Sequence, residues 1–182
     1  MALQHLRFAY ADPPYLGMCS YYQHNHGGPV IPDGGCWDNL ETHRRLIDRL
    51  STSWPDGWAL SLASTNLRDI LPLCPPDVRV ASWVKPFASW KPTQRVPYTW
   101  EPVIFRGGRS RADSDADATR DHLSCSITLK AGFVGAKPPE FSRWLLGLWG
   151  VEPGDEVDDL FTGSGGVARA WAAARSQAVL AL

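Results

Sequence analysis

The sequence has 182 residues, which is enough for one α/β domain with a buried core and too few for two of ordinary size. Its formal net charge of -1 excludes a basic surface over the whole molecule, so any contact with nucleic acid must come from a local group of cations. No apolar stretch is long enough to cross a bilayer and no signal-peptide pattern is present, and we therefore expect a cytoplasmic protein.

The first half of the sequence predicts two strands separated by a helix. A strand over residues 6–11 is stopped by Asp12-Pro13-Pro14, and a polar loop rich in glycine and histidine covers residues 20–35. Apolar residues then recur at helical spacing, at Trp37, Leu40, Leu46, Ile47 and Leu50. A strand over residues 58–62 leads into a short helix over residues 65–71, which Pro72 disrupts.

The second half continues the alternation of strands and helices. Strands are predicted over residues 78–84 and 102–105, an exposed loop over 106–121, and an ambiguous segment, a candidate β-hairpin, over 123–134. A helix opens at Pro138-Pro139 and stops at Gly150, with an apolar face of Phe141, Trp144, Leu145 and Leu148. A strand over 156–161, a glycine turn over 163–166 and an alanine-rich helix follow. This order predicts a single α/β domain, a mostly parallel sheet with helices on both faces.

Two short motifs directly follow predicted strands. The first is Asp12-Pro13-Pro14-Tyr15, and the second spans residues 159–165, with the sequence Asp-Leu-Phe-Thr-Gly-Ser-Gly. Ligands of open parallel sheets bind beyond the carboxyl ends of the strands, where the strand order reverses. We therefore expect both motifs to line one binding site.

The glycine motif is a general ligand-binding feature. Glycines let the backbone approach a ligand closely, and the amide groups at a helix start point toward its polar groups. Such a turn also occurs for purely structural reasons, so it leaves the ligand open. It lacks the lysine of a phosphate-binding loop, and the sequence has no nucleophile elbow, which disfavours an NTPase and a serine or cysteine hydrolase.

Asp12-Pro13-Pro14-Tyr15 is more specific, because two prolines fix a rigid turn whose carbonyl groups have no local amide partner. Such a turn suits a substrate that donates hydrogen bonds, such as the exocyclic amine of a base. Asp12 and the Pro13 carbonyl would each accept an N–H and so aim the nitrogen lone pair at an electrophilic methyl group. Tyr15 would stack on a base that has left its duplex. The alternative is a structural proline-rich turn capped by Asp12.

With these motifs in this order, the sequence resembles the bacterial and phage amino-methyltransferases that act on adenine N6 or cytosine N4 of DNA. The residues that carry the resemblance are Asp12-Pro13-Pro14-Tyr15, Phe161 to Gly165, and the pair Lys137-Pro138. Their order, with the catalytic motif first, is similar to that of the circularly permuted subgroup. The resemblance implies a Rossmann-like S-adenosylmethionine-dependent methyltransferase fold, trimmed at one edge of the sheet. The aspartate of the first motif favours adenine N6.

The resemblance also implies roles by position. Asp12, Pro13, Pro14 and Tyr15 would be the catalytic residues that hold the amine and its base. S-adenosylmethionine would be held by Asp12, Lys137, Pro138, Asp159, Phe161, Gly163, Ser164 and Gly165. Cytosine N4, adenine in RNA and an inactive nucleic-acid-binding subunit are the alternatives to adenine N6 in DNA.

Two features depart from the family pattern. The family has a further strand whose acid holds the cofactor ribose, and no such strand is evident here, so we expect weaker cofactor binding, another acid (Glu140, Asp155 or Asp158) or a partner that completes the site. A target-recognition domain is also missing, with the loop 106–121 in its place. Sequence preference would then be loose, or supplied by a second copy or a partner subunit.

A basic and aromatic stretch follows the middle of the sequence. Between residues 85 and 111 lie six cations (Lys85, Lys91, Arg95, Arg106, Arg109 and Arg111) and one acid, Glu101, interleaved with Phe87, Trp90, Tyr98 and Trp100. Stacking rings within a basic groove are typical of single-strand binding, so we assign Lys91, Arg95, Arg106 and Arg109 to nucleic acid. The alternative is that Trp83, Trp100 and Phe105 belong to the core and the cations solvate a loop.

Cysteines and histidines give a weaker signal. Cys19, His24, His26, Cys36 and His43 fit no standard zinc spacing, so we expect no metal, and the scattered cysteines are expected to be free thiols. His24 and His26 instead belong to the glycine-rich loop after Tyr15, which is predicted to close over the base as a lid.

Overall fold

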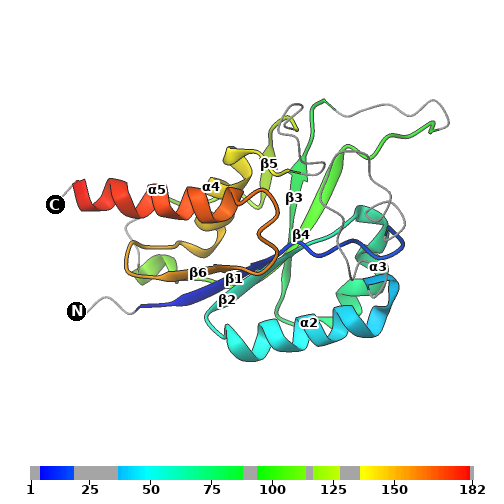
Figure 1. Ribbon diagram of the computed structural model, residues 1–182, viewed down its shortest axis with the longest axis horizontal. Helices are drawn as coiled ribbons and strands as arrows, with labels where there is room; N and C mark the ends of the chain where they lie inside the picture. The colour runs from blue at the N-terminus through cyan, green and yellow to red at the C-terminus, as the bar shows by residue number, and fades with distance from the viewer. Residues whose placement is uncertain (1–4, 19–36, 88–93, 114–116, 128–135, 181–182) are drawn as a thin grey trace.

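The core of the protein is a six-stranded sheet with the order β5-β3-β4-β2-β1-β6 (Figure 1). The computed structural model describes residues 5–18, 37–87, 94–113, 117–127 and 136–180. The strands are β1 (Arg7–Ala11), β2 (Gly57–Ser61), β3 (Arg79–Val84), β4 (Trp100–Gly107), β5 (His122–Ser124) and β6 (Glu156–Asp159). The predicted lid over residues 20–35 lies outside the described residues.

All strands except β4 point the same way. β1 is parallel to both of its neighbours, β2 and β6, and β5 is parallel to β3. β4 is antiparallel to β2 and to β3. The predicted mixed α/β fold with a mostly parallel sheet is therefore confirmed, and within the described part of the chain β6 forms one edge.

Helices cover the two faces of the sheet (Figure 1). The helices are α2 (Leu40–Ser53), α3 (Leu67–Ile70), α4 (Pro139–Trp149) and α5 (Gly166–Leu180). Short 3-10 turns flank them, namely η2 (Ser64–Asn66), η3 (Leu71–Leu73) and η4 (Arg111–Asp113). No helix among the described residues is long and apolar enough to cross a membrane.

Alternate residues of β1 fill two separate hydrophobic cores. Phe8 and Tyr10 pack in one core with α4, while Ala9 and Ala11 pack in the other with α2. This alternation follows from the strand period of two, which sends successive side chains to opposite faces. All four are fully or almost fully buried, so β1 is the central strand on which both layers rest.

Capping residues lie at the start of α2 and at both ends of α4, where the sequence predicted the ends of α4. α2 begins after Asn39, whose side chain accepts a hydrogen bond from the amide of Glu41 at 2.8 Å. α4 begins after Pro138 and ends at Gly150, which adopts the left-handed conformation (φ 61°) that glycine allows without strain. Of the predicted apolar stripe, Leu46, Ile47 and Leu50 are buried on α2. Leu40 lies in the first turn and is 39% exposed, and Trp37 lies before the helix and is partly exposed.

Three element predictions need correction. Pro72 ends the α-helical part of its segment, but a 3-10 turn continues through Leu73 because proline is tolerated in a first helical turn. β4 extends into the predicted loop through Arg106 and Gly107, because these residues pair with Trp58 and Gly57 of β2. The strand predicted over 156–161 ends at Asp159. Residues 122–124 form a strand parallel to β3, and most of the candidate hairpin over 123–134 lies outside the described residues.

Candidate functional site

Both predicted motifs lie at the same edge of the sheet. β1 and β6 are neighbouring parallel strands whose register pairs Tyr10 with Asp159. The Asp12 motif therefore leaves β1 beside the point where the glycine turn leaves β6. Pro13 and Pro14 are buried, and Tyr15 is partly exposed.

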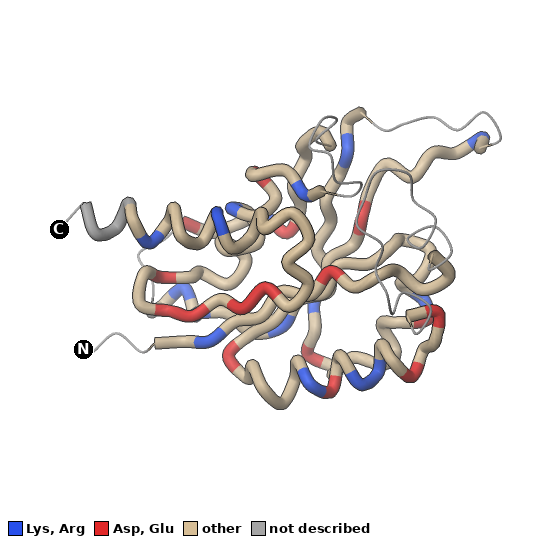
Figure 2. Tube along the Cα trace, in the orientation of Figure 1, with Lys and Arg blue, Asp and Glu red and all other residues tan. Residues whose placement is uncertain are grey.

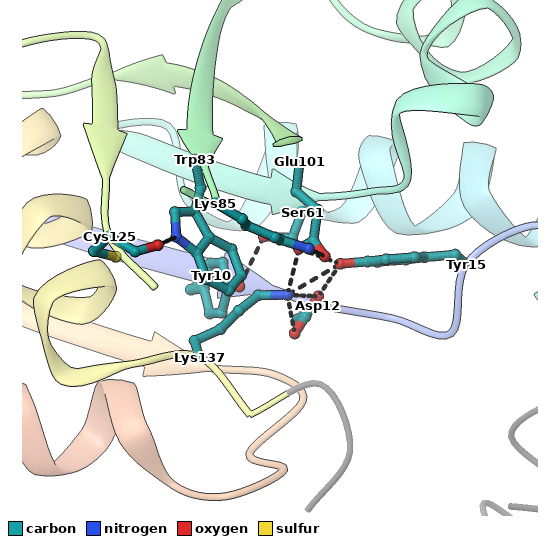
Figure 3. Close-up of polar contacts among 9 residues, drawn as sticks. All are labelled: Tyr10, Asp12, Tyr15, Ser61, Trp83, Lys85, Glu101, Cys125 and Lys137. Atoms are coloured by element: carbon teal, nitrogen blue, oxygen red, sulfur yellow. Dashed lines mark hydrogen bonds and ion pairs between the residues drawn. The ribbon is translucent and has the colours of Figure 1, made fainter. Parts of the chain in front are cut away.

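An ion network of four side chains lies at this edge (Figure 3). The Lys137 ammonium lies 3.2 Å from Asp12 Oδ2 and 3.1 Å from Glu101 Oε2. Glu101 Oε1 accepts a second hydrogen bond from Lys85. Carboxylates and ammonium groups thus alternate from Asp12 to Lys85, in a site where each side chain is less than one quarter exposed.

Tyr15 connects the two carboxylates. Its hydroxyl lies 3.1 Å from Asp12 Oδ1 and 3.3 Å from Glu101 Oε2, and it accepts a hydrogen bond from Lys137 at 3.0 Å. The Tyr15 ring was expected to stack on a base, and the structure places its hydroxyl end inside the ion network. Tyr15 is therefore fixed at both Asp12 and Glu101.

The two carboxylates of the network differ in protonation behaviour. Burial raises the pKa of Asp12, and the single ammonium of Lys137 opposes that shift only in part. Burial would also raise the pKa of Glu101, but Lys137 and Lys85 together lower it to about 2. Because burial opposes its charge while Asp12 and Glu101 favour it, the net effect on the pKa of Lys137 is a rise well above the usual value. The charged form of Lys137 is therefore held between two acids.

Aromatic residues enclose the ammonium of Lys137. It lies 5.6 Å from the ring centres of Tyr15 and Trp83 and 5.8 Å from that of Phe141. Below these rings, the buried Tyr10 hydroxyl is hydrogen-bonded to Ser61 at 2.8 Å. These rings therefore surround the Lys137 ammonium and stabilise its charge through cation–π contacts.

The glycine turn brings backbone and one acid to the site. Gly163 (φ 42°) and Gly165 (φ 71°) both adopt left-handed conformations, and the Ser164 carbonyl accepts a hydrogen bond from Arg169 at 2.6 Å. Burial raises the pKa of Asp159, a hydrogen bond from the Phe161 backbone opposes this shift, and the nearby Asp12 charge adds to it. Asp159 Oδ1 is buried and has no hydrogen-bond partner among the described residues. A buried carboxylate oxygen without a partner, beside the glycine turn, suits a cationic ligand.

An open groove of about 320 Å³ lies against Phe161. Phe161 packs edge-on against Trp37, with ring centres 5.2 Å apart. The groove is lined by Trp37, Thr42, Arg45, Leu46, Arg49, Leu160 and Phe161. It is an aromatic and basic surface between α2 and the end of β6.

Among the described residues, the structure does not bring the predicted nucleic-acid residues Arg95, Arg106 and Arg109 together. Lys91 lies outside the described residues, and Arg95 is exposed on the β3–β4 connection. Arg106 pairs with Trp58 at the amino end of β2, away from the Asp12 edge, and its guanidinium binds Asp77. Lys and Arg are spread along the chain, and α2 carries both signs (Figure 2).

Arg109 lies inside the protein. Its side chain is only 5% exposed, and it donates to Asp155 Oδ1 and Oδ2 at 2.8 and 3.0 Å. The predicted exposed loop is therefore anchored at this point, and the Arg109 guanidinium is not available to a phosphate. Asp155, one of the acids considered for the ribose, is fully engaged in the same contact.

Two other acids considered for the ribose also have partners. Asp158 accepts a hydrogen bond from the Trp54 indole at 2.7 Å, and Glu140 lies 3.5 Å from Arg143 on the surface of α4. No group of three or more metal-binding side chains occurs among the described residues. His43, the described histidine of the weak zinc pattern, is buried and hydrogen-bonded to the Trp37 carbonyl at 3.0 Å.

Glu101 and Lys85 join the site although no motif of the sequence contains them. Glu101 is the single acid in a stretch of six cations, and that isolation was the available signal. It reaches Lys137 and Tyr15 only because β4 runs antiparallel to β2 and begins at the edge where β1 ends.

Comparisons with known proteins give a match in fold. No protein-family model and no curated protein matches the sequence. The crystal structure of M1.HpyAVI in complex with SAM matches with a TM-score of 0.55 and 13% identity, over 91% of this chain and 76% of that one. A crystal structure of M1.HpyAVI matches with a TM-score of 0.56 and 14% identity, over 94% and 78%. The chain shares the fold of M1.HpyAVI. At this identity, the likeness concerns the fold alone.

Proposed function

We propose that this chain is an S-adenosylmethionine-dependent methyltransferase that methylates an exocyclic amino group of a DNA base, with adenine N6 as the preferred atom. The observation that carries the proposal is the meeting of Asp12-Pro13-Pro14-Tyr15 and the glycine turn at the ends of neighbouring parallel strands. The fold shared with M1.HpyAVI, whose complex with SAM has been solved, supports the choice of cofactor.

The residues at the glycine turn fit this cofactor. S-adenosylmethionine carries a sulfonium and an ammonium group, and when bound it supplies an electrophilic methyl group. The unpaired oxygen of Asp159 and the nearby carboxylate of Asp12 provide negative charge for these cations. Gly163, Ser164 and Gly165 offer backbone groups before the start of α5, and Lys137 and Pro138 border the site just before α4.

On the substrate side, Asp12 and the Pro13 carbonyl accept hydrogen bonds from the target amine. This contact orients the nitrogen lone pair toward the methyl group. Without it the lone pair is delocalised into the base, and the amine is a poor nucleophile. Tyr15 lies next to Asp12 and presents its ring to the base, which leaves the stack to enter the site. The sequence of the β3–β4 connection carries Lys91 and Arg95, and its residues Phe87, Val96 and Tyr98 are exposed. We propose this connection as the contact surface for the nucleic-acid strand. The positions of Arg106 and Arg109 remove them from this surface.

The test is transfer of a labelled methyl group from S-adenosylmethionine to unmodified DNA, followed by mass spectrometry of the nucleosides. We expect N6-methyladenine with the wild type and at least about a hundredfold less product with Asp12→Ala, because the amine loses its orienting acceptor. Asp56→Ala, an acid at the amino end of β2, is the matched control and should retain activity.

The same experiment separates the alternatives. N4-methylcytosine, or label only on RNA, would replace adenine in DNA as the substrate. DNA binding without cofactor binding or transfer would favour an inactive binding subunit. Transfer that appears only with a second protein, or that rises steeply with protein concentration, would indicate a partner or a dimer that completes the site.

A further inference from the structure

Glu101 takes part in the ion network although it belongs to neither motif. It is at the start of β4, and its side chain is 19% exposed. Its two oxygens have different partners: Oε1 accepts from Lys85, while Oε2 accepts from Lys137 and from the Tyr15 hydroxyl. Glu101 is therefore held in one orientation by groups from the segments that follow β1 and β3 and precede α4.

Lys137 is shared almost equally between two acids. Its ammonium lies 3.3 Å and 3.2 Å from the two oxygens of Asp12 and 3.1 Å from Glu101 Oε2. The Lys137 side chain is only 9% exposed, so water offers little alternative solvation. An ammonium group in this position must be satisfied by these acids, by the Tyr15 hydroxyl and by the surrounding rings.

This sharing creates a competition at Asp12. A target amine needs an Asp12 oxygen as its acceptor, and both oxygens already lie within reach of Lys137. Were Asp12 its only partner, Lys137 could not release an oxygen without leaving a buried charge unpaired, which is costly. Glu101 provides a second acceptor at equal distance.

We propose that Glu101 is a positioning residue. It accepts the hydrogen bonds of the Lys137 ammonium when a target amine binds to Asp12. The inference rests on the proposed function, because it takes the amine to be that of a nucleic-acid base. Lys85 contributes by holding Oε1 of Glu101, so that Oε2 stays directed at Lys137. Lys137 remains charged throughout and moves only between hydrogen-bond partners.

The first test needs no activity. The pKa of Asp12 is measured by carboxyl carbon-13 NMR in the wild type and in Glu101→Gln. We expect a lower pKa of Asp12 in the variant, because a neighbouring negative charge is gone and Lys137 turns wholly to Asp12. Glu156→Gln, which changes an exposed glutamate at the amino end of β6, is the matched control and should leave Asp12 unchanged.

A second variant should change the pKa of Asp12 in the opposite direction. Lys85→Met removes the cation on the far side of Glu101, so Glu101 attracts Lys137 more strongly and the pKa of Asp12 should rise. This comparison also decides the matter if Glu101→Gln does not fold. An unchanged pKa of Asp12 in Lys85→Met, or a change in the other direction in either variant, would overturn the proposal.

The second test uses methyl transfer. Glu101→Gln should lower kcat/KM for the nucleic acid by about tenfold, the worth of one charge-assisted hydrogen bond. It should also shift the acidic limb of the pH profile to lower pH, whereas Glu101→Asp should keep that limb and recover part of the rate. In a Lys137→Met background, Glu101→Gln should lower kcat/KM little further, since Glu101 acts through Lys137.

Additive losses in the double variant would show that Glu101 acts independently of Lys137 and would contradict the inference. If the wild type transfers no methyl group to any nucleic acid, the proposed function fails. The NMR titrations then decide the Glu101–Lys137 arrangement separately.

Discussion

Asp12 and Glu101 share one lysine, yet their pKa values shift in opposite directions. The difference comes from the number of cations that each carboxylate contacts. Asp12 faces Lys137 alone, and its burial dominates, whereas Glu101 lies between Lys137 and Lys85. The acid that would bind the amine is therefore the one whose charge is less stabilised, which leaves it a better hydrogen-bond acceptor for a new donor.

The low pKa of Glu101 predicts a pH-dependent contribution to stability. The pKa is about 2 in the folded protein and near 4.5 otherwise. Between these values the unfolded chain binds a proton that the folded chain does not, so stability rises with pH across this window. The stability difference between the wild type and Glu101→Gln should be full above pH 4.5 and shrink toward pH 2. Urea unfolding at several pH values measures it, and a difference that stays constant across the window would refute the prediction.

Tyr15 combines a ring and a hydroxyl, and variants can separate their roles. Tyr15→Phe keeps the ring and removes the hydrogen bonds to Asp12 and Glu101. Tyr15→Ala also removes the stacking surface, which is worth about 1–3 kcal/mol per base. We expect Tyr15→Ala to lower nucleic-acid affinity by about tenfold more than Tyr15→Phe, as measured by fluorescence anisotropy. Equal losses would indicate that the hydroxyl alone matters.

At the scale of elements, local signals determine where the helices begin and end. Asn39 caps α2 through Glu41, Pro138 precedes α4, and Gly150 closes α4 in a left-handed conformation. Each signal acts within one helical turn, so its effect does not depend on the rest of the fold. The strands are less well defined locally: β4 runs past its predicted end because β2 offers partners for Arg106 and Gly107.

The Asn39 cap gives a test at this scale. Asn39→Ala removes the acceptor for the Glu41 amide and should lower the free energy of unfolding by about 1 kcal/mol. Asn39→Asp keeps an acceptor at the same place and should be close to the wild type. Chemical denaturation followed by circular dichroism measures both variants, and an equal loss in both would mean that the amide group, and not the cap, is required.

At the scale of the whole molecule, Asp155 joins two distant segments to its own turn. It accepts hydrogen bonds from Arg109 after β4, from the backbone amide of Leu6 before β1, and from the amide of Glu152 after α4. The Asp155 side chain is 1% exposed. This buried contact holds the amino ends of β1 and β6 to the connection that follows β4, at the edge opposite the candidate site.

Removing one partner of this contact should be costly. Arg109→Leu leaves the Asp155 charge buried without its cation and should destabilise the protein by about 3–5 kcal/mol. Arg106→Leu breaks an ion pair with an exposed partner, Asp77, and should cost less than about 1 kcal/mol. Thermal unfolding compares the two. Similar small effects would show that Arg109 is not a structural residue.

The sequence by itself determined the layered α/β fold, the helix ends and the two motifs of the site. These follow from apolar periodicity, from capping residues and from rigid or permissive residues such as Pro13 and Gly163, whose physical effects are local. Only the tertiary structure decided that Glu101, Lys85 and Lys137 join Asp12, and that Arg109 serves Asp155 and not a phosphate. Partners that are distant in sequence are selected by strand order and register, because an ion pair in the interior depends on which side chains the sheet brings within a few ångströms.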